Sequence, residues 1–354
     1  MFVPPRCPYR ACRHHHRPAR SFFRRHGAYH PKCRPRPVPR FRCRACLRTF
    51  SRQTFRSDYR DHRPDLNARL FTALASGLGL RQSARTLGLS LRCTELKFRK
   101  LARHLRRLNL NLWQPLSTDA SFQLDELETF ESERNTRPLS VPVLIETKSR
   151  YVVWAESATI RPRGKMTRQR KQRIARSEER YGPRKDLSRR ALKRTLRRGA
   201  DLALDLPFVV LSTDEKSSYP GLAGEAFGKH RLIHLRTNSK LARTTWNPLF
   251  PINHTEALAR DLMGRLRRQS WLASKKRRYL DLGLQLFMAY RNFVRKRFNY
   301  DEESPAQLLG FAPRRLRPGE VLSWRQDWNE ESIHPLSLRG TSIESWRRRA
   351  ARAA

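Results

Sequence analysis

Residues 119–133 hold six acidic side chains and no basic one, in a 354-residue chain that has 76 Lys and Arg against 31 Asp and Glu. Leu124, Leu127 and Phe130 alternate with acids there, which predicts a β-strand that carries a carboxylate at Asp125. Carboxylates that gather a divalent cation beside a polyanion would explain this acidic island. The simpler interpretation is that the acids neutralise neighbouring arginines. Asp125 is therefore the first candidate metal ligand.

The net charge of +45 and the pI near 11.5 make nucleic acid the leading partner, because Lys and Arg neutralise phosphates. A basic membrane-surface protein is the competing class. The sequence has no long apolar run and no signal peptide, so we expect no membrane partner. Arginine outnumbers lysine, as bidentate phosphate contacts favour, although genomic composition can produce the same bias.

Two close cysteine pairs lie near the start, Cys7-x4-Cys12 and Cys43-x2-Cys46. Two such pairs on short turns are what a tetrahedral structural Zn²⁺ site needs, so residues 1–60 are predicted to form a zinc ribbon that unfolds without the ion. Free thiols in a disordered basic tail are the alternative. Cys33 is left over, and His14, His15, His16, His26 and His30 could substitute as ligands.

Residues 61–112 change to a helical pattern. Apolar spacing predicts a helix over 66–74, a short one over 81–87 and, after Ser90, a basic amphipathic helix. This succession is typical of a helix-turn-helix, and a three-helix bundle with a solvated basic face is the alternative. We predict DNA contacts from the basic face, which carries Arg92, Lys97, Arg99, Lys100 and Arg103.

Two β-rich runs over 141–147 and 151–156 follow the acidic strand and predict a hairpin. Residues 163–198 then contain sixteen Lys and Arg and three acids. Such a basic helical insertion is interpreted either as a solvated charge run or as a DNA clamp.

The apolar run 206–211 is typical of a buried strand, and Asp214 follows its end, where open sheets place functional sites. The alternative for Asp214 is a turn or helix-cap acid. A helix is expected from about Asn253, with Glu256 in its first turn, and the same two residues also fit a capping box. Cations mixed with an aromatic residue predict further DNA contacts from Arg265, Arg268, Trp271 and Lys275.

The order of strand, hairpin, strand and helix matches a ribonuclease-H-like α/β domain with a mixed sheet over residues 118–315. In that fold the first and fourth strands are neighbours, which would bring Asp125 and Asp214 together while the helix presents Glu256. Three carboxylates can hold two Mg²⁺ or Mn²⁺ ions about 3.5–4 Å apart. Ligands that are all oxygen suit these ions better than zinc.

These motifs, in this order, resemble the DDE transposases of bacterial insertion sequences. Asp125-Glu-Leu-Glu-Thr-Phe resembles their first-aspartate motif, Ser212-Thr-Asp214 with Tyr219 the second, and Asn253-His-Thr-Glu256 the third. Residues 304–310 resemble the segment that closes the domain. The resemblance covers roughly residues 5–315. It departs from the pattern in the very basic insertion, and Asp261 is the alternative third acid.

The resemblance implies a transposase that binds terminal inverted repeats through the first two domains. It implies Mg²⁺-dependent hydrolysis of a phosphodiester, attack of the freed 3′-OH on target DNA, and a homodimer or larger assembly on double-stranded DNA. A cytoplasmic, nucleoid-associated location in a bacterium follows. The competing classes are a non-catalytic DNA-binding protein, such as a regulator or a decayed transposase, and a nuclease that cuts without joining.

The predicted chain is thus multidomain. It comprises a zinc ribbon (1–60), an all-α helix-turn-helix domain (61–112), a catalytic domain (118–315) with a basic helical insertion (163–200), and a basic tail (316–354).

Overall fold

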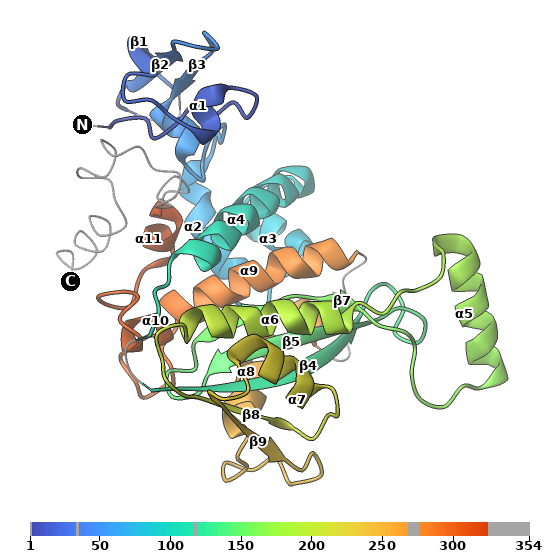
Figure 1. Ribbon diagram of the computed structural model, residues 1–354. Helices are drawn as coiled ribbons and strands as arrows, with labels where there is room; N and C mark the ends of the chain where they lie inside the picture. Colours follow the sequence, from blue (N-terminus) through green and yellow to red (C-terminus); the bar gives the residue numbers. More distant parts are fainter. Residues whose placement is uncertain (1, 33–34, 117–118, 268–275, 325–354) are drawn as a thin grey trace.

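The computed structural model describes residues 2–32, 35–116, 119–267 and 276–324. A small cysteine-containing region lies at one end of the molecule, a group of helices follows, and a larger sheet domain forms the other end (Figure 1). The chain is therefore multidomain in character, with helices, a mixed sheet and a cysteine cluster. No helix within the described residues is both long and apolar enough to span a membrane.

The N-terminal region is a three-stranded antiparallel sheet in the order β1(Phe23–Tyr29), β2(Val38–Cys43), β3(Thr49–Ser51). The short helix α1(Arg13–His16) precedes it, and the 3₁₀ turns η1(Arg52–Phe55) and η2(Pro64–Leu66) follow. Its core is small and aromatic, with buried Phe22, Phe41, Phe50 and Phe55 beside the cysteines. So small a core supplies little stability by itself, which leaves room for a stabilising metal.

Three helices follow, α2(Asn67–Leu74), α3(Leu80–Thr86) and α4(Leu91–Asn111), which agrees with the helical spacing of the sequence. Ser90 starts α4, because its hydroxyl accepts the backbone N–H of Cys93 at 3.2 Å. The buried face of α4 includes Phe98, Leu101, Leu105 and Leu108, and it packs against α2, α3 and α9(Arg277–Phe293).

The central sheet is mixed. Its strands are β4(Ala120–Phe130), β5(Pro138–Glu146), β6(Val152–Ala155), β8(Val209–Asp214) and β9(Leu232–Thr237), in the order β6-β5-β4-β8-β9, and β7(Ala158–Thr159) also pairs with β5. β5 is antiparallel to β4 and β6, whereas β8 is parallel to β4 and β9. The predicted hairpin and the predicted neighbourhood of the first and fourth strands are both confirmed.

Helices cover both faces of this sheet. One face packs against α6(Ser188–Leu202) and α7(Tyr219–Phe227), and the other packs against α8(Phe250–Leu262) and α9. The side chains of β5 alternate between the two layers, Leu144 on the first side and Val143 and Ile145 on the second. Gly199 lets α6 lie close to the sheet, because a Cβ there would sit 2.7 Å from Leu144 Cδ2.

The basic insertion predicted over 163–200 divides into two different helices. α6 buries Leu192 and Leu196 and belongs to the body of the domain. α5(Arg168–Tyr181) buries none of its residues and projects away from the body (Figure 1). The chain then closes through η3(Gly264–Leu266), α10(Pro305–Leu308) and α11(Pro318–Ser323). Most of the predicted basic tail, residues 325–354, lies outside the described residues.

Candidate active site

The register of two central strands brings Asp125 and Asp214 to neighbouring positions. β4 and β8 are parallel, and Gln123 pairs with Ser212. Asp125 and Asp214 each come two residues later, so they project from the same face of adjacent strands. The two carboxylates interact, since the charge of Asp214 adds to the effect of burial in raising the pKa of Asp125.

A buried glutamine places the third acid beside them. The Gln123 side-chain amide donates to the Pro248 carbonyl at 2.8 Å, and its oxygen accepts the Ile252 N–H at 3.0 Å. These two bonds fix the start of α8 against β4. Glu256 lies one helical turn beyond Ile252, and its charge interacts with that of Asp125.

Glu256 is not a helix-capping residue. α8 begins at Phe250, with Leu249 as its N-cap, three residues before the predicted start. Asn253 and Glu256 are therefore inside the helix, and the capping-box alternative is wrong. The Glu256 side chain is only 4% exposed and is paired along the helix with Arg260, at 3.4 Å. Asp261, the alternative third acid, is exposed and does not line the cleft.

Burial makes the charged forms of two of these carboxylates unfavourable. Burial, reinforced by the charge of Asp214, raises the pKa of Asp125 to about 6. Burial, reinforced by the charge of Asp125, raises the pKa of Glu256 to about 8. Glu256 Oε1 is buried and has no hydrogen-bond partner among the described residues. The carboxylates are therefore under-compensated where they meet, and a cation would satisfy them.

The residues fit a hard divalent cation in their chemistry, because all the ligand atoms offered are carboxylate oxygens. The three carboxyl groups, however, are not held close together. Among the described residues, the four cysteines are the only group of three or more ligand side chains close enough together to hold a metal ion, with donor atoms within 4.8 Å of one another. The three carboxyl groups are thus spread more widely than the shell of one enclosed ion.

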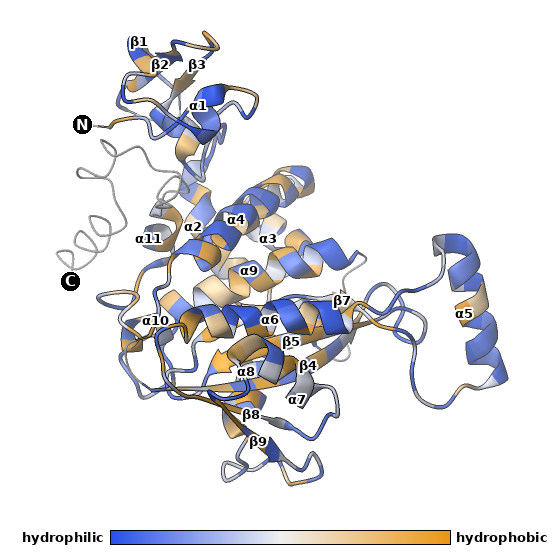
Figure 2. Ribbon diagram, in the orientation of Figure 1, coloured by the Kyte–Doolittle hydropathy of each residue, from blue (hydrophilic) through white to orange (hydrophobic). Residues whose placement is uncertain are grey.

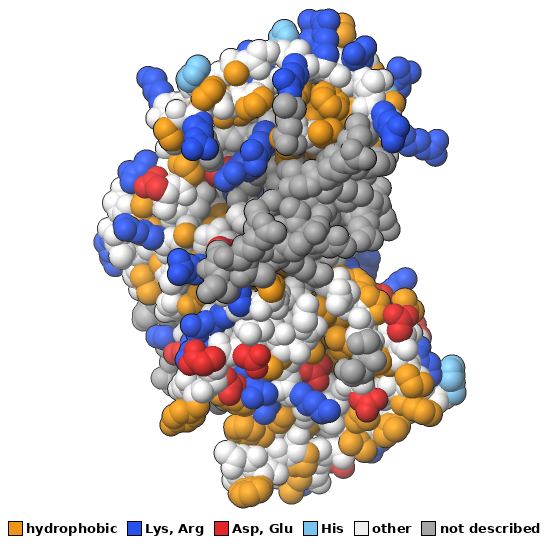
Figure 3. Space-filling view, turned by 90° about the vertical axis from the view of Figure 1, so that its left-hand side faces the viewer, with side chains coloured by type: hydrophobic (Ala, Val, Ile, Leu, Met, Phe, Trp, Pro, Cys, Tyr) orange, Lys and Arg blue, Asp and Glu red, His pale blue; other side chains and the backbone are white. Residues whose placement is uncertain are grey.

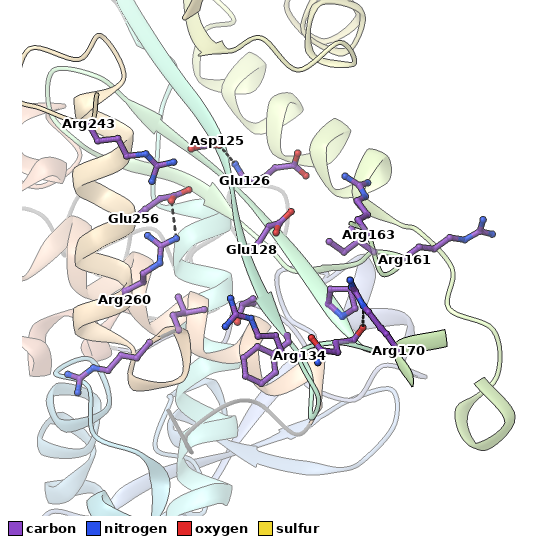
Figure 4. A pocket seen from close by; sticks show the side chains of 17 residues that line it. Asp125, Glu126, Glu128, Arg134, Arg161, Arg163, Arg170, Arg243, Glu256 and Arg260 are labelled. Atoms are coloured by element: carbon purple, nitrogen blue, oxygen red, sulfur yellow. Dashed lines mark hydrogen bonds and ion pairs between the residues drawn. The ribbon is translucent and has the colours of Figure 1, made fainter. Parts of the chain in front are cut away.

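A cleft of about 420 Å³ is lined by Asp125 and Glu256, whereas Asp214 is not among its lining residues (Figure 4). Four carboxylates and seven arginines line it. Arg243 and Arg260 lie beside Glu256, Arg134 lies near the end of the acidic strand, and Arg161, Arg163 and Arg170 lie across that strand. The arginines that line the cleft are Arg134, Arg161, Arg163, Arg170, Arg243, Arg260 and Arg267. A cleft lined by both carboxylates and arginines suits an anionic substrate that approaches a bound cation.

The neighbouring acid Glu126 plays a different part. Its Oε1 accepts the Ser140 hydroxyl at 2.7 Å, and its Oε2 accepts Lys216 Nζ and the Tyr219 hydroxyl. These donors already satisfy Glu126, so it is a poor candidate for a metal ligand. Tyr219 is buried, and its burial together with the charges of Asp125, Asp214 and Glu256 raises its pKa.

The cysteine cluster is the second candidate centre. Cys7 Sγ lies 3.6 Å from Cys46 Sγ, and Cys12 Sγ lies 3.7 Å from Cys43 Sγ. Four sulfurs at about 2.3 Å from a tetrahedral Zn²⁺ would be about 3.8 Å apart. The four thiols can therefore bind a metal such as zinc. No histidine of the described ranges joins this group, and Cys33 lies outside them.

The predicted DNA-contacting residues have different environments. Arg92 and Arg103 are exposed on α4, and Arg99 is half-buried. The Lys100 ammonium donates to the Tyr59 carbonyl. Arg265 is half-buried, and burial lowers its pKa to about 10. Arg268, Trp271 and Lys275 lie outside the described residues.

Lys97 was predicted to contact DNA, and this assignment is wrong. It is 4% exposed, and its ammonium forms an ion pair with Asp61 and donates to the Arg63 carbonyl at 2.7 Å. Lys97 therefore faces the junction between the N-terminal region and α2. Its helical position placed it on the basic face, but its partners lie thirty or more residues away in sequence and left no local signal.

Two further residues of the site were missed by the sequence analysis. Arg243 is exposed in the cleft, and its charge lowers the pKa of both Asp125 and Glu256 against the effect of burial. It lies in a polar stretch without a motif. In the sequence Gln123 is an ordinary polar residue of the acidic strand, and its position two residues before Asp125, on the same strand face, is the one signal that could have found it.

A scan of the sequence against protein-family models finds no match, and a comparison with curated proteins finds none either.

Proposed function

We propose that the chain is a DNA-cleaving and strand-transferring enzyme of the DDE transposase type, with Asp125, Asp214 and Glu256 as its catalytic carboxylates. The observation that carries the proposal is that Asp125 and Glu256 line one arginine-rich cleft, where Glu256 Oε1 is buried without a partner among the described residues, while Asp214 projects from the neighbouring strand on the same sheet face as Asp125. The strand order, with the first strand beside the fourth, supports a ribonuclease-H-like domain.

Asp125, Asp214 and Glu256 would hold Mg²⁺ or Mn²⁺. When bound, two such ions activate the attacking oxygen and stabilise the leaving one. Other residues of the chain bind the substrate and position the acids. Arg243 and the arginines across the cleft bind phosphate oxygens, and Gln123 fixes α8 so that Glu256 stays beside Asp125.

In the proposed reaction water hydrolyses a phosphodiester at the end of an element and leaves a 3′-OH. That hydroxyl attacks a phosphodiester of target DNA in line, so one phosphorus–oxygen bond forms as another breaks. No covalent bond between protein and DNA is needed. Since two ends must be joined, a homodimer or larger assembly would do the work.

The N-terminal regions would bind the terminal repeats. The cysteine cluster would form a zinc ribbon with β1, β2 and β3, and α3 and α4 would form a helix-turn-helix that presents Arg92 and Arg103. On the face seen in Figure 3, Lys and Arg side chains dominate the upper part and Asp and Glu lie mainly in the lower half. The upper region thus has the charge that phosphate binding needs.

A cleavage assay on labelled duplex DNA from the ends that flank the gene tests the proposal. We expect nicking with Mg²⁺ or Mn²⁺, none with EDTA, and a drop of at least about a thousandfold in Asp214→Asn and Asp125→Asn, as when transition-state stabilisation is removed. Binding to the ends should stay within about twofold. Nicking by either variant at the wild-type rate would remove that acid from the site.

Binding without nicking under every metal condition would instead favour the non-catalytic DNA-binding protein. Nicking without joined products would favour the nuclease.

The zinc assignment has its own test. Purified protein should hold one Zn²⁺ per chain, and Cys43→Ser should lose it together with the folded N-terminal region. Cys93→Ser, outside the cluster, is the matched control and should keep the metal. Full zinc content in Cys43→Ser would remove that thiol from the cluster.

A further inference from the structure

Within the described residues, helix α5 makes contacts with the body of the domain at its two ends, through Arg170 and Tyr181, but it packs no face against it. None of its fourteen residues is buried, and it is almost wholly hydrophilic (Figure 2). A helix of this length is marginal in water without tertiary contacts. Something other than burial must favour the helical form.

The charges of α5 are also arranged against the helix dipole. Its first turn contains Arg168, Arg170 and Lys171 and no acid, whereas Glu178 and Glu179 lie near its end. The dipole favours acids at the start and cations at the end. In total α5 holds six cations against two acids. A polyanion beside the helix would offset both the missing packing and the reversed charges.

The C-terminal end of α5 is held against the body of the domain, although the helix itself buries no residue. Arg184 follows the helix, and its guanidinium donates to the Pro138 carbonyl at 2.7 Å and to the Ile160 carbonyl at 3.0 Å. It is also paired with Glu131 at 3.5 Å, and its side chain is only 7% exposed. Arg137 lies over the Tyr181 ring at 4.5 Å. The body of the domain therefore sets where α5 leaves it.

The other end of α5 borders the carboxylate cleft. Thr167 starts the helix by accepting the Arg170 N–H, and Arg170 in turn donates to the Asn135 carbonyl at 3.4 Å. Arg170 and Asn135 both line the cleft, together with Arg161 and Arg163 (Figure 4). Cations thus continue from the cleft wall onto the exposed helix without interruption by an acid in the first turn.

We propose that α5 is a DNA-binding arm that holds the duplex where it leaves the carboxylate cleft, and that its helix is stabilised by this interaction. The inference rests on the proposed function only in taking DNA as the substrate of the cleft. A second copy of the chain is a poor occupant, because it carries the same net charge of +45. Duplex DNA supplies regularly spaced phosphates along a length that a straight helix can follow.

The first experiment compares two matched triple variants of the full chain. The arm variant carries Lys171→Gln, Arg173→Gln and Arg176→Gln, all exposed on α5. The control variant carries Lys229→Gln, Arg236→Gln and Arg315→Gln, which are exposed outside α5 and the cleft. Both remove three positive charges, so a difference between them reports position and not net charge.

Duplex affinity is measured with EDTA present, at several salt concentrations. Each phosphate that a variant no longer neutralises should lower the slope of log affinity against log salt by about 0.9. We expect the arm variant to show a slope lower by about 1–3 and an affinity weaker by at least about tenfold at low salt. The control should stay within about threefold of wild type. Equal weakening in the two variants would overturn the proposal.

Hydrogen exchange supplies the second readout. Backbone amides over 171–181 should exchange at least about tenfold more slowly in the DNA complex than in the free chain, because binding stabilises the helix. Exchange that is unchanged while the rest of the protein binds DNA would overturn the proposal. So would protection of α5 in the free chain that rises with protein concentration, since that indicates a second copy as the occupant.

Neither readout depends on catalysis. If the arm behaves as expected and no metal-dependent nicking is found, the proposed enzyme fails and the arm stands. If nicking is found and the arm variant binds and exchanges like the control, only the arm fails.

Discussion

Asp61 and Glu256 are both acids with nearly inaccessible side chains, 6% and 4% exposed, yet their environments push their pKa values in opposite directions. Burial would raise the pKa of Asp61, but hydrogen bonds from Lys97 and Asn67 outweigh it and the pKa is lowered. Burial raises the pKa of Glu256 to about 8, helped by Asp125. We call Asp61 matched, because both of its oxygens have partners within the fold. We call Glu256 unmatched, because one of its oxygens has no partner among the described residues.

The atoms explain the difference. Asp61 accepts from Lys97 Nζ on one oxygen and from Asn67 Nδ2, at 2.9 Å, on the other. Glu256 has Arg260 on one oxygen and, within the described ranges, no partner on the other. A buried acid that serves the fold is satisfied by its neighbours, whereas an unsatisfied one needs a reason outside the fold. This contrast separates a structural acid from a candidate site.

The largest expected effect is the disruption of the matched pair. Lys97→Met would keep most of the side-chain volume and leave Asp61 buried without its ammonium. Removing one partner of a buried pair typically lowers the free energy of unfolding by about 3–5 kcal/mol. Urea unfolding monitored by circular dichroism measures it.

Arg103→Met is the matched control for Lys97→Met, since Arg103 is exposed on the same helix. It should change stability by less than about 0.5 kcal/mol. Its duplex affinity should fall instead, with a salt slope lower by about 0.9, which Lys97→Met should not show. A stable Lys97→Met with weakened DNA binding would restore Lys97 as a DNA contact.

The unmatched acid should respond with the opposite sign. The folded pKa of Glu256 lies above its ordinary value of 4.5, so between that pH and about 8 the native state keeps a proton that the unfolded state loses. Stability therefore falls as the pH rises through this range. Without divalent metal, Glu256→Gln should be more stable than wild type at pH 8, by about 2–3 kcal/mol.

Divalent metal should reverse that order. Mg²⁺ should raise the unfolding temperature of the wild type and leave that of Glu256→Gln nearly unchanged, because binding to the native state alone stabilises it. Thermal unfolding with Mg²⁺ and with EDTA, from pH 5 to pH 8, decides this. A variant less stable than wild type in EDTA at pH 8 would show that Glu256 is matched within the fold after all.

The sequence predicted what depends on local pattern. The acidic strand, the hairpin, the parallel strand that ends in Asp214 and the helix that carries Glu256 all follow from runs of apolar residues and their boundaries. The cysteine pairs predicted their own cluster, because short turns fix each pair. These features need no knowledge of distant contacts.

What the sequence did not predict depends on distant contacts. Lys97 and Lys171 both belong to basic helices, but only the first meets a buried acid thirty-six residues away. α5 and α6 are both basic, yet only α6 places leucines against the sheet. Composition describes Lys97 and Lys171 alike and only tertiary packing separates them, whereas the leucines of α6, which α5 lacks, are already visible in the sequence.

A smaller effect should come from Gln123, which links the sheet to the site. Gln123→Ala would leave the Ile252 N–H and the Pro248 carbonyl unpaired beneath α8. One unpaired buried group lowers the free energy of unfolding by about 1–3 kcal/mol. Nicking should fall further than stability explains, because Glu256 loses its fixed position. Gln123→Glu keeps an oxygen that can accept the Ile252 N–H but loses the donor to the Pro248 carbonyl and adds a charge near Asp125, so it tests the two bonds separately. Nicking unchanged in Gln123→Ala would show that α8 holds Glu256 without this link.

The smallest effect is the pH dependence of the matched pair. The folded pKa of Asp61 lies below its ordinary value of 3.8, so the native state binds its proton less tightly than the unfolded state. The stabilisation is complete above pH 3.8 and is lost as the pH falls through the folded pKa. The stability gap between wild type and Lys97→Met should therefore narrow as the pH falls below 3.8, because a protonated Asp61 no longer gains from the ammonium. Urea midpoints measured from neutral to acidic pH give the stability gap between the two proteins directly.

A gap that widens on acidification would mean that Asp61 is not the partner that Lys97 stabilises. Asp61 would then no longer serve as the structural acid in the comparison with Glu256, whose ionisation destabilises the fold more as the pH rises.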